Sequence, residues 1–137
     1  MVDRGLAGDA ATDGRRLRVF VVDDERLARE RLIRLLRAVG GVEIVGEASN
    51  GADAIDEVAR QRPEVVFLDV HMPGMDGFEV ARRLGEPRPE VVFATAHDHQ
   101  SLHAGEHLLK PFGRRQLTAV LARLRQRLSA RPAPAVA

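Results

Sequence analysis

The side chains best suited to chemistry stand where short apolar runs of the sequence end. A short apolar run bounded by turn residues is typical of a buried strand, and all-apolar strands suit a parallel sheet that is covered on both faces. The carboxyl edge of such a sheet is where open α/β folds bind their ligands. The residues at these run ends are Asp23, Asp24, Asp69, Thr95 and Lys110.

Asp69 alone does not decide between two interpretations. It follows Val65–Leu68 and precedes Pro73 and Gly74, and an Asp beside Pro and Gly often does no more than cap a turn. Three carboxylates in one pocket are different, because they repel one another unless some are protonated or a cation lies among them. Oxygen ligands without Cys favour a hard ion such as Mg²⁺, which keeps waters and leaves positions open for phosphate oxygens.

Such a site predicts phosphoryl transfer to the protein itself. With Mg²⁺ held by one or two carboxylates, another carboxylate is free to act as the nucleophile. The hydroxyl of Thr95 and the ammonium of Lys110 would then stabilise the equatorial oxygens of the phosphoryl group as charge spreads there.

The elements that must position these side chains follow an alternating pattern. β-rich apolar runs alternate with segments whose apolar residues recur at helical spacing. Five such units with short loops predict an α/β fold, a flavodoxin-like doubly wound parallel sheet in the order 2-1-3-4-5, in which strands one and three are neighbours. Strands are expected at Leu17–Val22, Val42–Glu47, Val65–Asp69, Val91–Thr95 and Glu106–Leu109, and helices at Arg26–Val39, Ala52–Arg60, Phe78–Leu84, His99–Ala104 and Gly113–Leu128.

Local signals mark several helix ends and surfaces. Gly40-Gly41 should end the first helix, and Asn50 and Asp76 should cap the starts of two later ones. On the first helix the spacing predicts ion pairs between residues four apart, namely Glu25–Arg29 and Glu30–Arg34.

Composition bounds the class of protein. The 137 residues are 45% hydrophobic, which suits one domain with a core: a flexible leader over 1–16, a folded domain over 17–129, and a Pro/Ala-rich tail or linker over 130–137. A net charge of +1 gives no argument for direct nucleic-acid binding. Cys is absent, no apolar run approaches the ~20 residues of a membrane span, and no signal peptide is evident, so a cytoplasmic location is expected.

Five short fragments, in order at the strand ends, resemble the receiver domain of bacterial two-component response regulators. The resemblance covers about Leu17–Leu128, and the wording around the first and fourth fragments looks most like receivers of LytTR-type regulators. The fragments are Asp23-Asp24-Glu25, Asp69, Met72-Pro73 with Gly77, Thr95-Ala96, and Lys110-Pro111-Phe112.

The resemblance implies a role for each residue of the site. Asp69 would accept a phosphoryl group from a sensor histidine kinase. Asp24, Asp69 and the main-chain carbonyl of His71 would bind Mg²⁺, and Asp23 would hold a metal-bound water. The residues that would contact the phosphoryl group are Thr95 and Lys110.

The sequence departs from the family between Thr95 and Lys110. The chain is shorter there by roughly one and a half helical turns, so the fourth helix of the fold is predicted to be truncated and His97–Glu106 to be the most mobile part of the folded core. His107 stands where the family usually has Tyr or Phe, three residues before the lysine. Phosphate chemistry should survive these changes, whereas the conventional readout of phosphorylation need not. The Lys110–Pro111 bond is expected to be cis.

The resulting prediction is a phosphoacceptor and not an enzyme acting on an external substrate. A flavodoxin-like mononucleotide enzyme would need a Gly/Ser/Thr-rich loop after the first strand, where this chain has three acids. A haloacid-dehalogenase-type phosphatase would need a second acid at His71. The remaining alternative is a vestigial receiver that acts as a phosphorylation-independent interaction module.

Expected partners are a histidine kinase and, as an open alternative, a second copy of the chain. DNA would be reached through a LytTR-type domain outside these residues, and no membrane is expected to be involved.

Overall fold

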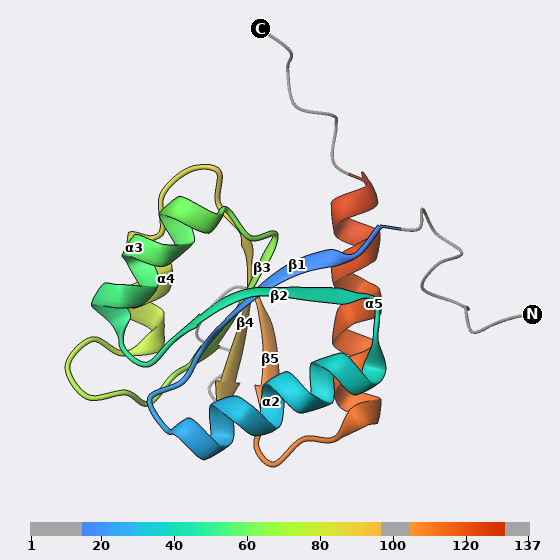
Figure 1. Ribbon diagram of the computed structural model, residues 1–137, viewed down its shortest axis with the longest axis horizontal. Coiled ribbons are helices and arrows are strands. Elements are labelled where there is room, and N and C mark those ends of the chain that lie inside the picture. Colours follow the sequence, from blue (N-terminus) through green and yellow to red (C-terminus); the bar gives the residue numbers. More distant parts are fainter. Residues whose placement is uncertain (1–14, 97–104, 131–137) are drawn as a thin grey trace, which may run out of the picture.

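The computed structural model describes residues 15–96 and 105–130, and its centre is a parallel sheet of five strands (Figure 1). The strand order is β2-β1-β3-β4-β5, which confirms the predicted fold class. In chain order the elements are β1 (Leu17–Val22), α2 (Arg26–Val39), β2 (Val42–Ala48), α3 (Gly51–Gln61), β3 (Val65–Asp69), α4 (Gly77–Arg83), β4 (Glu90–Thr95), β5 (Glu106–Leu109) and α5 (Arg114–Ala130).

Helices cover both faces of the sheet, as the all-apolar strands predict. Figure 1 shows α2 and α5 on one side of the sheet and α3 and α4 on the other. Along β1, Val19 and Val21 contribute to the core beneath α2 and α5, whereas Phe20 and Val22 contribute to the core beneath α3 and α4. Strand β3 is buried along its whole length, because it lies at the middle of the sheet.

The predicted helix caps are confirmed. The side chain of Asn50 accepts a hydrogen bond from the main-chain N–H of Asp53 at 2.8 Å, and Asp76 accepts one from Glu79 at 2.9 Å. Gly40 ends α2 with a positive φ of 87°, a conformation that favours glycine. These caps fix where α3 and α4 begin, and hence how they lie on the sheet.

Several predictions fall on other parts of the chain. The short helix at His99–Ala104, the truncation of that helix, most of the segment expected to be mobile, and nearly all of the leader and the tail lie outside the described residues. Within the described ranges, no helix combines the length and the apolar character that a membrane crossing needs.

Candidate functional site

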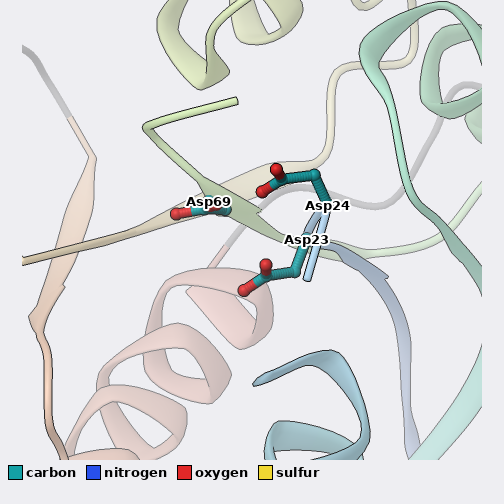
Figure 2. A group of neighbouring side chains, drawn as sticks. All are labelled: Asp23, Asp24 and Asp69. Carbon is teal, nitrogen blue, oxygen red and sulfur yellow. The ribbon is translucent and has the colours of Figure 1, made fainter. Parts of the chain in front are cut away.

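Three carboxylates meet at the carboxyl edge of the sheet. Figure 2 shows Asp23 and Asp24 reaching from the end of β1 towards Asp69 at the end of β3. One carboxylate oxygen from each residue lies within 4.8 Å of the others. Asp23 is 5% exposed and Asp69 is 6% exposed, while Asp24 is the most accessible of the three. The sequence-predicted cluster therefore forms.

Strand pairing brings the cluster together. β1 and β3 are parallel neighbours with Val22 opposite Leu68, so the residues that follow each strand emerge at the same edge. The main-chain N–H of Asp23 donates to the carbonyl of Ala48 on β2 at 3.1 Å. The carboxyl end of β1 is consequently anchored on both sides before the chain turns into α2.

Lys110 brings a positive charge to two of the carboxylates. Its Nζ donates to Oδ2 of Asp23 at 3.3 Å and to Oδ1 of Asp69 at 3.2 Å. The main-chain N–H of Lys110 donates to the carbonyl of Thr95 at 2.7 Å, which places the ends of β4 and β5 side by side. The Lys110–Pro111 peptide bond is cis, as predicted.

Burial makes the ionised form of Asp69 unfavourable. Burial, followed by the negative charge of Asp23, raises the pKa of Asp69 from 3.8 to about 6, although Lys110 acts in the opposite direction. Burial lowers the pKa of Lys110, but the charges of Asp23 and Asp69 outweigh it, so the pKa of this amine is raised and it stays charged. One ammonium thus faces three carboxyl groups, and the cluster is short of positive charge.

The chemistry of the donor set fits Mg²⁺. The side-chain donors in the cluster are carboxylate oxygens, the ligands that this ion prefers. His71, whose main-chain carbonyl is the predicted further ligand, lies two residues after β3 and is exposed. Thr95, at the end of β4, is 2% exposed. Distances between side-chain atoms therefore join Asp23, Asp24, Asp69 and Lys110 into one cluster. The roles predicted for Thr95 and His71 rest on their positions in the fold.

Gly77, the first residue of α4, lies against the strand that carries Asp69. A Cβ atom at this position would be 2.4 Å from the carbonyl oxygen of Asp69 and 3.0 Å from Cα of Val70. Its own N–H donates to the carbonyl of Val70 at 2.9 Å. The main chain at Gly77 thus packs directly against Asp69 and Val70 and brings together the two ends of the loop that contains His71. Glycine permits this contact because it has no side chain.

Three aromatic rings form a row that runs from α4 through β4 to β5. The ring of His107 lies 5.4 Å from that of Phe93, which lies 4.8 Å from that of Phe78. His107 thus packs on an aromatic neighbour, as the Tyr or Phe expected at its position could.

The contacts of two charged side chains near the site, those of Arg29 and Glu30, differ from what the sequence predicts. The guanidinium of Arg29 contacts Glu47 and the main-chain carbonyl of Asp23 instead of forming the predicted ion pair with Glu25. Glu30 forms its ion pair with Arg26 instead of Arg34. The sequence carries a further signal for Lys110, which was predicted to lie at the site: it is the single lysine among 21 basic residues. A lone lysine among arginines indicates a position where a compact ammonium is needed.

The chain matches the family model of the response regulator receiver domain over residues 19–122. Because this match covers most of the chain, the protein belongs to the family of response regulator receiver domains. The resemblance seen in the sequence is thereby confirmed.

Named relatives agree with the family. The transcriptional regulatory protein BtsR of Salmonella typhi is 44% identical over 119 residues, which are 82% of this chain and 50% of BtsR. The sensory transduction protein LytT of Bacillus cereus is 41% identical over 117 residues, 80% of this chain and 48% of LytT. The chain therefore spans about half the length of these curated relatives.

Solved structures show the same fold. The signal receiver domain of the response regulator NarL from Mycobacterium tuberculosis has a TM-score of 0.71 and 38% identity, covering 81% of this chain and 98% of that one. The response regulatory domain of mrkE from Klebsiella pneumoniae has a TM-score of 0.75 and 27% identity, covering 84% of this chain and 100% of that one.

Proposed function

We propose that this receiver domain takes a phosphoryl group from a sensor histidine kinase onto Asp69, with Mg²⁺ as the cofactor. The observation that carries the proposal is the cluster of three carboxylates within 4.8 Å with Lys110 bonded to two of them, in a chain that belongs to the receiver family. Asp24, Asp69 and the carbonyl of His71 would hold the ion, and Asp23 would hold one of its waters.

The transfer forms one bond and breaks one. A carboxylate oxygen of Asp69 forms the new O–P bond while the P–N bond of the donor phosphohistidine breaks, and the leaving imidazole nitrogen takes up a proton. Lys110 and Thr95 stabilise the charge on the equatorial oxygens by hydrogen bonding. Mg²⁺ neutralises part of that charge when bound. Burial raises the pKa of Asp69 to about 6 and so disfavours its ionised form. A cation bound nearby would offset this effect and favour the ionised nucleophile.

The same site would return to its starting state by hydrolysis. Water attacks phosphorus, the O–P bond to Asp69 breaks, and inorganic phosphate leaves. The chain itself would turn over no external substrate, so we assign it signalling and not enzymatic function, in the cytoplasm. Because its relatives are about twice as long and include a transcriptional regulator, the output would be transcriptional and would depend on a further, LytTR-type domain.

A phosphodonor experiment tests the proposal. The chain is treated with acetyl phosphate with and without Mg²⁺, and the adduct is mapped by mass spectrometry. We expect one phosphoryl group on Asp69, dependent on Mg²⁺ and absent from Asp69→Asn. An adduct that persists in that variant would refute the assignment, and no adduct in the parent would favour the vestigial interaction module.

A further inference from the structure

Arg29 on α2 joins the acidic turn to the neighbouring strand. Its Nη1 donates to the main-chain carbonyl of Asp23 at 2.8 Å, and its Nε donates to Oε1 of Glu47 at 2.7 Å. The side chain of Arg29 is 15% exposed, whereas that of Glu47 is 48% exposed. The Arg29 side chain is thus largely buried, and its guanidinium is held by two hydrogen bonds. An arginine in an ordinary surface ion pair is more exposed and less constrained.

The carbonyl that Arg29 binds belongs to the peptide group that precedes Asp24. A peptide group is planar, so a bond that fixes its oxygen also fixes the direction in which the chain enters Asp24. The other polar groups of Asp23 are already engaged: its N–H with Ala48, its Oδ1 with the N–H of Glu25 at 2.9 Å, and its Oδ2 with Lys110. The bond from Arg29 engages the remaining polar group of Asp23, the carbonyl oxygen of the peptide that leads into Asp24.

Asp24 depends on that peptide more than its neighbours do. Asp23 and Asp69 are buried and bonded to Lys110, whereas Asp24 is more exposed. A more exposed carboxylate is less confined by its surroundings, so its orientation depends more on the main chain that carries it. Mg²⁺ demands near-ideal octahedral geometry, so a small rotation of this peptide would weaken binding.

We propose that Arg29, oriented by Glu47, is a positioning residue that sets the direction of the Asp24 carboxylate for Mg²⁺ binding. This inference rests on the proposed function, because it assumes that the carboxylates hold the ion. Lysine cannot replace Arg29 fully, since one ammonium lacks the planar fork that reaches a carbonyl and a carboxylate together.

Magnesium binding tests the inference directly. The dissociation constant is measured by calorimetry and by amide NMR shifts for the parent, Arg29→Ala, Arg29→Lys, Glu47→Gln and Arg34→Ala. We expect affinity about tenfold weaker in Arg29→Ala, at the lower end of the effect of losing an outer-shell partner, and smaller losses in Arg29→Lys and Glu47→Gln. Arg34 is exposed on the same helix, so Arg34→Ala removes the same charge and should bind as the parent does.

A second readout separates positioning from a purely structural role. With acetyl phosphate, the Mg²⁺ concentration for half-maximal phosphorylation should rise about tenfold in Arg29→Ala while the rate at saturating Mg²⁺ stays close to that of the parent. A residue that only supported the fold would lower the melting temperature without this shift.

Each outcome bears on one claim. If the parent binds Mg²⁺ and Arg29→Ala binds it equally well, the inference is wrong. If Arg29→Ala does not fold, Glu47→Gln and Arg29→Lys decide, and parent-like affinity in both overturns it. If the parent itself fails to bind Mg²⁺, the proposed function fails, which is a different result.

Discussion

Two groups of side chains, one at the carboxyl edge of the sheet and one on α4, β4 and β5, are held in different ways. The carboxylate cluster (Asp23, Asp24, Asp69 and Lys110) depends on directional hydrogen bonds, with Asp23 bonded through its main chain and both carboxylate oxygens. The ring cluster (Phe78, Phe93 and His107) depends on side-chain packing.

Under the proposed function, the carboxylate cluster would carry out the phosphoryl chemistry and the ring cluster would take part in its readout. Hydrogen bonds with narrow distance and angle requirements hold reacting groups in one geometry, whereas packed rings tolerate replacement by others of similar shape. The carboxylate cluster has the residues that the resemblance to the family implies, whereas His107, which stands where the family usually has Tyr or Phe, lies in the ring cluster. Substitutions in the two clusters should therefore have separable effects.

The largest expected effect comes from removing the charge of Asp69. Asp69→Asn should stabilise the metal-free fold at neutral pH by up to about 3 kcal/mol, since each pKa unit corresponds to about 1.4 kcal/mol. The folded protein binds this proton more tightly, with a pKa of about 6 against 3.8. The contribution of Asp69 to the free energy of unfolding is hence greatest below the lower value and decreases as pH rises through the window between them.

Urea unfolding without Mg²⁺, followed by circular dichroism, checks this effect. The advantage of Asp69→Asn over the parent should grow between about pH 4 and pH 6 and stay constant above. Asp56→Asn, on the exposed part of α3, controls for net charge. Lower stability of Asp69→Asn at neutral pH would contradict the electrostatic account of the cluster.

Removing the ammonium of Lys110 should have the next largest effect. Lys110→Met should slow phosphorylation by acetyl phosphate about a hundredfold at saturating Mg²⁺, comparable to losing one donor to a developing negative charge. Lys110→Arg keeps the charge with a different geometry and should lie between. The measurement is the rate of adduct formation by mass spectrometry, and a rate in Lys110→Met close to that of the parent would show that the amine has no such role.

A methyl group at Gly77 should disturb the main chain beside Asp69. Gly77→Ala should destabilise the fold by about 1–3 kcal/mol, because the added carbon would meet backbone atoms of Asp69 and Val70 that cannot move independently. Gly85→Ala is the matched control, since a Cβ atom at Gly85 meets no atom within 4 Å. Equal urea midpoints for the two variants would contradict this explanation.

The smallest effect is expected in the ring cluster. His107→Phe should change the free energy of unfolding by less than about 1 kcal/mol, because a phenyl ring can keep the contact with Phe93. Its phosphorylation rate should stay within about twofold of the parent, far from the hundredfold loss in Lys110→Met. A loss as large as that of Lys110→Met would show that the two clusters are not separable.

The strands and the carboxylate cluster could be predicted because their signals are local. Apolar runs that stop at acids or turn residues mark strand ends, and parallel pairing brings those ends to one edge, so Asp23 and Asp69 meet whatever the details of the loops. The bounds of β1, α2, β3 and β5 agree with the predicted ranges. The Mg²⁺ ligation and the kinase stay predictions that follow from the family.

Contacts between distant segments could not be predicted in the same way. Spacing at the start of α2 predicted an ion pair between Arg29 and Glu25. Instead, β2 pairs with β1 and places Glu47 opposite Val21, where the guanidinium of Arg29 reaches it. The need for glycine at position 77 likewise depends on how closely α4 approaches β3. Both contacts arise from strand pairing and helix packing, which no local pattern specifies.

The most direct test of the account is a titration with beryllofluoride and Mg²⁺, followed by amide NMR. The account predicts a saturable one-to-one complex that requires Mg²⁺, with the largest shifts at Asp24, Val70 and Lys110 and none of these shifts in Asp69→Asn. In His107→Phe the same complex should form with similar affinity. Failure of the parent to form the complex, or its formation in Asp69→Asn, would contradict the assignment of Asp69 as the phosphoacceptor.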